Sequence, residues 1–362
     1  MGSIAHASTK LNAFLSAGFL LWGILAPCTA PAGPLTDLQA TYTGATTGYP
    51  DYTAEGTGGY GAGPYSMSFE TGAGDDDDLV LERFSASGRT YGIDRMADNL
   101  AIRRIDNANV TGERTLLWYE ETDRSGTDID LRPGRVLTME ESLISPVINR
   151  GADNVFANDA ATNPNNIERI DYFFDGGLTA AETAEQRSRQ GFVILDRGGN
   201  DAFQIAAILN THPQHWDKYD HTGLVAAGDG AAGPQWGPTA YSVTSVVFRA
   251  DNGETDLNPS ANVSEQTLSG IFFTFEEMGL TAGQSILGYS LFAADVTPAG
   301  GGSSQFNYPT VTTEDSDEGG LDLVAGGVYA TVDAAVPEPA SCLLFAAGLA
   351  GLLLQRRRRT GP

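Results

Sequence analysis

Three of the chain's four histidines fall in one short segment, and histidine together with aspartate is a ligand set that suits zinc or copper. The segment reads THPQHWDKYDH and contains His212, His215 and His221. Pro213 breaks any helix at this point, so a helical face cannot bring the first two histidines together. An exposed polar loop explains the same cluster. The segment therefore leaves two interpretations open, a metal site and a solvated loop.

A second segment, DNGETDLN at residues 251–258, offers the oxygen ligands that calcium prefers, among them Asp251 and Asp256. An acidic chain gains by binding cations, and calcium is the one cofactor that the sequence suggests. The spacing differs from that of an EF-hand loop, because glycine stands at the third position. A hairpin turn, in which Asn and Asp side chains bond their own backbone, is the other interpretation.

The familiar catalytic motifs are absent from the sequence, which contains neither a G-x-S-x-G elbow nor an H-E-x-x-H helix. The glycine-rich segment 58–63 lacks the lysine of a phosphate-binding loop. Acidic residues are so numerous that no pair can be singled out for glycoside hydrolysis, and none can be dismissed. We predict no catalytic residue and a body that is not an enzyme, with a secreted polysaccharide-active enzyme as an alternative.

The elements that must position these residues are strands. Ten segments rich in β-branched and aromatic residues recur between clusters of Gly, Asn, Asp and Pro, as in antiparallel sheets. They are residues 79–84, 100–105, 115–121, 167–174, 191–197, 203–209, 241–250, 268–277, 285–296 and 326–336. We predict a mainly β fold, an antiparallel sandwich or jelly roll. One helix is expected at Thr179–Gln190, where Thr179 and Glu182 form a capping box.

The composition divides the chain into four parts. Residues 1–32 form an export signal, and residues 33–78, rich in Gly, Thr and Tyr, are expected to be irregular. The β-sandwich-like ectodomain occupies residues 79–335, with a long loop at 298–320. Residues 336–362 form a separate C-terminal segment.

The charge excludes one class of partner. The formal net charge is −25, and the ends of the chain hold Lys10 and the arginines 356–359, so the body between them is more acidic still. Such a body repels phosphate backbones, which excludes nucleic acid. The two cysteines, Cys28 and Cys342, lie in the hydrophobic ends, so the body has neither an internal disulfide nor a thiolate site.

The N-terminus has the three parts of a secretory signal: a positive charge at Lys10, an apolar run at residues 13–26, and the cleavage sequence Ala30-Pro31-Ala32. We expect export through the Sec machinery and cleavage by signal peptidase after Ala32. At the other end, residues 340–354 carry no charge. As a helix they would span roughly 22 Å, which is short for a bilayer core of about 30 Å. Flanking arginines and local thinning make a crossing feasible.

The C-terminal segment resembles the PEP-CTERM sorting signal of Gram-negative and related bacteria. Its motif, transmembrane helix and basic cluster follow one another in the same order. The matching residues are Val336, Pro337, Glu338 and Pro339, then helix 340–354, then Arg356, Arg357, Arg358 and Arg359. The resemblance implies recognition by exosortase, a membrane cysteine transpeptidase. It also implies a temporary inner-membrane anchor and delivery of the body to the outer surface or the extracellular matrix.

The body is similar to segments of all-β ectodomains in secreted bacterial proteins over roughly residues 150–295, a resemblance that brings no activity with it. We therefore expect a structural or adhesive protein embedded in exopolysaccharide or biofilm. A calcium-assisted carbohydrate-binding module is the leading alternative.

Overall fold

The computed structural model of the chain describes residues 33–43, 51–69, 77–104, 114–157, 166–212, 215–251, 256–294, 296 and 320–332. The expected signal peptide with Ala30 and Ala32, nearly all of the expected loop 298–320, and the segment 336–362 lie outside these residues. Within them, no helix combines the length and the apolar character needed to cross a bilayer. The transmembrane helix 340–354 stays a prediction.

The larger of two sheets joins strands from the whole length of the body, antiparallel apart from the parallel pair β3–β8. Its hydrogen-bonded order is β1 (Gly33–Tyr42), β4 (Leu79–Ala86), β5 (Arg89–Met96), β18 (Leu323–Val332), β11 (Gln190–Arg197), β16 (Asn258–Thr274), β15 (Gly237–Ala250), β7 (Thr115–Ser125), β8 (Asp128–Leu131), β3 (Pro64–Phe69) and β2 (Tyr52–Glu55). A short strand, β9 (Arg150–Ala152), bridges β18 and β7. Because β1 also pairs with β16, the sheet is barrel-like.

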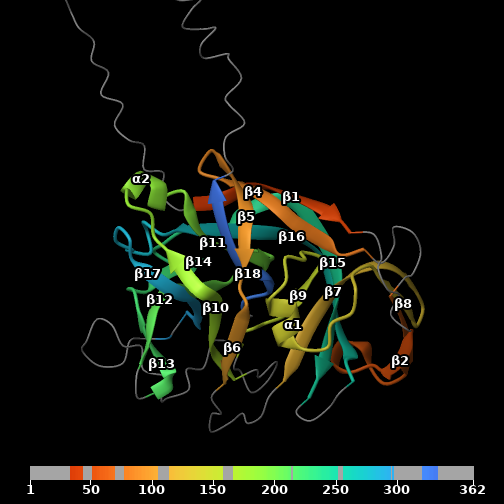
Figure 1. Ribbon diagram of the computed structural model, residues 1–362. Helices are drawn as coiled ribbons and strands as arrows, with labels where there is room; N and C mark the ends of the chain where they lie inside the picture. Colours follow the sequence, from red (N-terminus) through yellow and green to blue (C-terminus); the bar gives the residue numbers. More distant parts are fainter. Residues whose placement is uncertain are drawn as a thin grey trace, which may run out of the picture.

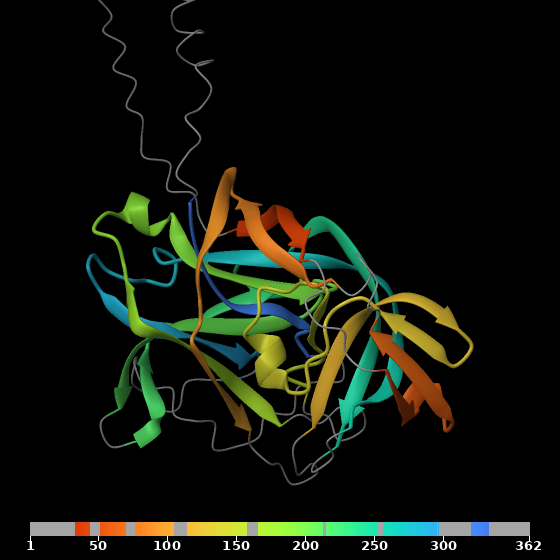
Figure 2. The same ribbon diagram turned by 45° about the vertical axis from the view of Figure 1, so that its right-hand side comes forward.

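The smaller sheet packs against the larger one, as the two views of the ribbon show (Figures 1 and 2). Its order is β13 (His215–His221), β12 (Ala202–His212), β17 (Ser285–Ala293), β10 (Ile167–Thr179) and β6 (Asn99–Arg104), with β14 (Val225–Gly228) paired to β12. The mainly β prediction is confirmed. Two stacked sheets fit a sandwich, and the barrel-like curl of the larger sheet is a feature that the sequence did not predict.

Strand β11 explains why some segments are apolar without alternation. Phe192 and Ile194 belong to the core between the sheets, whereas Val193 and Leu195 belong to the core inside the barrel-like part. Because successive side chains of a strand point to opposite faces, a strand between two cores must be apolar on both. Each of the ten predicted strand segments overlaps an observed strand, although residues 105 and 333–336 of these segments lie outside the described part of the chain.

The predicted helix Thr179–Gln190 is wrong in its extent. Thr179 still pairs with β17, and Gln190 already pairs with β18, so only one turn remains between them. That turn is α2 (Ala184–Arg187), and its capping box is made by Thr183 and Gln186 rather than by Thr179 and Glu182. A second short helix, α1 (Met139–Leu143), begins with the capping box of Thr138 and Glu141, a T-x-x-E pattern that was visible in the sequence.

Residues 33–78 are more regular than expected. They contribute β1, β2 and β3 together with a 3₁₀ turn, η1 (Gly58–Tyr60). The Gly- and Tyr-rich composition hid these strands because glycine lowers strand propensity. In β1, Leu35 is buried in the barrel core, which ties the first residues of the body to its centre.

Candidate functional site

A buried arginine at the end of β11 connects three distant segments of the chain. The Arg197 residue is 2% exposed. Its Nη2 donates to Asp153 Oδ1 at 2.5 Å and to Asp322 Oδ2 at 2.7 Å. Its Nη1 donates to the hydroxyl of Ser245 on β15 at 2.6 Å. The guanidinium therefore links β11 and β15 to the residue after β9 and the residue before β18.

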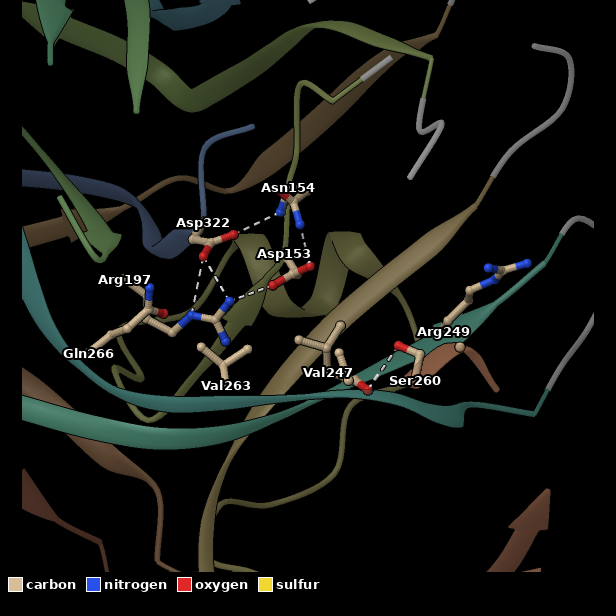
Figure 3. A pocket seen from close by; sticks show the side chains of 11 residues that line it. Asp153, Asn154, Arg197, Val247, Arg249, Ser260, Val263, Gln266 and Asp322 are labelled. Carbon is tan, nitrogen blue, oxygen red and sulfur yellow. Dashed lines mark hydrogen bonds and ion pairs between the residues drawn. The ribbon is translucent and has the colours of Figure 1, made fainter. Parts of the chain in front are cut away.

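The neighbours of Arg197 complete this polar network (Figure 3). The backbone N–H of Asn154 donates to Asp322 Oδ1 at 2.8 Å, and its side-chain amide donates to Asp153 Oδ2 at 2.7 Å. The guanidinium also lies 4.9 Å from the ring centre of Trp118, a cation–π contact in the barrel core. Each carboxylate thus has a partner on each of its two oxygens.

Burial raises the pKa of two acids near Arg197. Burial and the nearby charge of Asp322 raise the pKa of Asp153 to about 6. The same two causes raise the pKa of Asp196 to about 8, although its oxygens accept backbone N–H groups from Gly199 and Asp322. The shift favours the neutral form of the Asp196 carboxyl, which lowers the cost of burying the group.

This network forms one end of a cavity of about 540 Å³. Valines and alanine of β15 and β16, namely Val247, Ala261 and Val263, supply apolar lining. Arg249 and Ser260 lie toward the other end, away from Arg197 (Figure 3). The cavity combines paired charges with aliphatic surface, and such mixed lining is typical of small-molecule sites.

A second buried network lies in the smaller sheet. The Ser290 hydroxyl donates to Asp171 Oδ1 at 2.6 Å, and Nε2 of His221 lies 2.9 Å from the same hydroxyl. All three side chains are at most 1% exposed. In a catalytic triad the histidine stands between serine and acid, whereas here the serine stands between the other two. We therefore assign this cluster to the core and not to a nucleophile.

The backbone places the three predicted histidine ligands at different points of the β12–β13 hairpin. His212 and His215 are cross-strand partners in the β12–β13 hairpin, whereas His221 ends β13. At roughly 3.3 Å per residue, the six residues from His215 to His221 span about 20 Å. The ring nitrogens of His221 lie within hydrogen-bonding distance of Ser290 and the carbonyl oxygen of Tyr219. Burial and the charge of Arg169 lower the pKa of His221 to about 3.

One of the two predicted calcium ligands, Asp251, is already hydrogen-bonded to arginines. Asp251 accepts from Arg114 at 2.7 Å and from two nitrogens of Arg249, so arginines occupy both of its oxygens. Asp256 is exposed, and the residues between these two acids lie outside the described part of the chain. Across the residues that the structure describes, no group of three or more His, Cys, Asp or Glu side chains is placed to hold a metal.

The residues around Arg197 were missed by sequence reasoning because they come from segments that lie far apart in the chain. The one local signal is the pair Asp196-Arg197, which closes the otherwise apolar strand segment 191–197. Charged residues that continue the pattern of a buried strand must find partners, so the pair predicts a buried polar network but not its other members.

Together these features define an all-β body with a buried ion network beside a cavity. The comparisons with known proteins identify the C-terminus: a family described as the PEP-CTERM protein-sorting motif matches residues 335–359. That motif implies an exported protein that exosortase processes and that is anchored in a membrane beforehand. Neither the curated proteins nor the solved structures contain a match.

Proposed function

We propose that the chain is exported through the Sec machinery, processed by exosortase, and delivered to the outer surface or extracellular matrix. There its body serves a non-catalytic structural or adhesive role within exopolysaccharide or biofilm. The observation that carries the proposal is that the strands of the body lie between the two terminal sorting signals. Among the described residues, the first strand begins at Gly33, directly after the expected cleavage site, and the last strand ends at Val332, close before the matched motif at residues 335–359.

The position of strand β18 supports attachment of the body through its C-terminal end. Strand β18 is hydrogen-bonded to β11 along one edge and, over Val328–Val332, to β5 along the other, and its residues Leu323–Ala330 are buried. A body held by its C-terminal end would therefore be held by a strand inside the large sheet rather than by a peripheral one. The Arg197–Asp322 ion pair fixes the residue that precedes this strand.

The sorting part of the proposal is tested by replacing Pro337, Glu338 and Pro339 with alanine. We expect the unprocessed chain to accumulate in the inner membrane, measured by fractionation and immunoblotting. A triple alanine variant of Ser316, Asp317 and Glu318 is the matched control and should be processed normally. Normal surface delivery of the motif variant would contradict exosortase sorting.

The non-catalytic part is tested with the purified full chain and the exopolysaccharide of the producing cell. We expect no release of reducing sugar above the level of heat-denatured protein. Release that is abolished by a single acidic substitution, such as Asp153→Asn beside the cavity, would instead establish a polysaccharide-active enzyme.

A further inference from the structure

The cavity beside Arg197 has the size and lining of a ligand site. Its volume of about 540 Å³ lies within the range of roughly 300–1,000 Å³ that is typical of small-molecule pockets. Asp153 and Arg197, which line it, are themselves 3% and 2% exposed. The polar groups at this end are held in place by one another and are therefore preorganised for recognition.

The charges of the lining decide which ligands fit. A metal ion would need the space between Asp153 and Asp322, and the guanidinium of Arg197 already occupies it. An anion would need an uncompensated arginine, but Arg197 is paired with two carboxylates and Arg249 makes two bonds to Asp251. The acidic body also repels anions. A neutral ligand meets neither obstacle.

The carboxylates retain capacity to accept further hydrogen bonds. An ionised carboxylate offers about four acceptor positions. Asp153 accepts from Arg197 and Asn154, and Asp322 accepts from the Nε and Nη2 of Arg197 and from Asn154. Both therefore have lone pairs left for ligand hydroxyl groups. The aliphatic side chains of Val247, Ala261 and Val263 offer apolar surface to the C–H face of a ring.

We propose that this cavity binds a neutral saccharide, with ligand hydroxyls donating to Asp153 and Asp322 and the ring lying against Val263, without the help of calcium. The choice of a saccharide over other neutral polyhydroxylated molecules rests on the proposed role in a polysaccharide matrix. The site itself rests on the lining alone.

The test uses the full chain, purified in a detergent without a sugar headgroup so that the detergent does not compete. Glucose, galactose, N-acetylglucosamine and cellobiose are the neutral probes, glucuronate is the acidic probe, and calcium chloride is added in a separate arm. Saturation-transfer NMR and calorimetry measure binding. We expect at least one neutral saccharide to bind with a Kd that EDTA leaves unchanged.

Two variants locate the binding. Val263→Phe and, as a milder change, Ala261→Leu fill the cavity without replacing any residue of the ion network, and we expect either to raise the Kd by about tenfold or more. Val225→Phe alters a half-buried valine of the other sheet and should bind as the wild type does. Binding of glucuronate or calcium alone, no binding of any neutral probe, or wild-type affinity in both cavity variants would overturn the proposal. Processing of the C-terminal motif is measured separately, so a failure of saccharide binding can be distinguished from a failure of exosortase sorting.

Discussion

Arg197 and Asp322 form a buried ion pair across 125 positions of sequence, with Nη2 and Nε donating to the same carboxylate oxygen at 2.7 and 3.2 Å. Their side chains are 2% and 12% exposed. The pair joins the end of β11 to the residue that precedes β18, at the point where these neighbouring antiparallel strands meet. It thereby fixes the register at one end of the strand that leads to the sorting motif.

Loss of the arginine should be strongly destabilising. Arg197→Met leaves Asp153 and Asp322 buried without their cation, and removal of one partner of a buried pair costs about 3–5 kcal/mol. Urea denaturation followed by circular dichroism measures the change. The control is Arg189→Met in the exposed pair with Glu185, where both side chains are nearly half exposed and the expected cost is about 0–1 kcal/mol. Equal effects of the two substitutions would show that the network does not determine stability.

The stability of the body should fall as the pH rises toward the alkaline range. Burial and the charge of Asp322 raise the pKa of Asp196 to about 8, above its ordinary value of 3.8, so the native state binds this proton more tightly than the unfolded state. The contribution of Asp196 is therefore fully present below about pH 4 and is lost as the pH rises through about 8. Asp153, with a pKa of about 6, acts in the same direction at lower pH.

Asp196 dominates the change in the free energy of unfolding between about pH 7 and pH 8.5, because Asp153 and His221 have largely finished titrating there. We expect a decline over this interval in the wild type. Asp196→Asn, which cannot ionise, should lower the overall stability but flatten the decline. An unchanged slope in the variant would assign the pH dependence to other groups.

His221 should remain neutral through the physiological range. Burial and the charge of Arg169 lower its pKa to about 3, from an ordinary value of 6.5. The contribution of the neutral imidazole to stability is thus present above pH 6.5 and is lost as the pH falls toward 3. In NMR spectra of the folded protein, its imidazole signals should not titrate between about pH 5 and pH 8, whereas they should in urea.

Zinc provides a second measurement on the same residue. Because His221 lies about 20 Å along β13 from His215, and because its ring faces Ser290 and Tyr219, zinc should leave its signals unchanged. Zinc-dependent shifts of His221 would restore the metal interpretation of the histidine segment.

The sequence predicted the strands much better than it predicted their assembly. Alternation and apolar runs located β4, β10 and β11 because burial on one or two faces leaves a local signature. The pairing of Gly33 with Phe272, which closes the barrel-like part, leaves none, since any apolar strand could have filled that edge. Strand β1 itself was missed because its exposed half is polar and irregular.

The candidate site was beyond local reasoning for the same reason. Nothing in the local sequence distinguishes Asp153, Arg197 and Asp322 from the other charged residues of this acidic chain. Only the fold brings them together as ion pairs. By contrast, Val336–Pro339 could be recognised at once, because a sorting signal is read by another protein as a linear segment and needs no tertiary context. The histidine segment is divided between β12 and β13, so closeness in sequence does not by itself place its three histidines at one site.

Folding of the body should depend on its last strand. Strand β18 lies between β5 and β11, as Figure 1 shows in blue, and supplies Val328 to the barrel core and Tyr329 to the core between the sheets. A chain that ends at Gly320 would leave two open strand edges and uncover both cores, a loss that no surface rearrangement replaces. We expect such a chain to lack a cooperative urea transition. A chain that ends at Ala335 keeps every described strand and should match the full chain in midpoint and m-value.

If the chain that ends at Gly320 unfolded with the same m-value, β18 would be an accessory to an already folded body, and attachment through it would not hold the core. If it fails to fold, the body completes its fold only after the residues directly before the sorting motif have been exported.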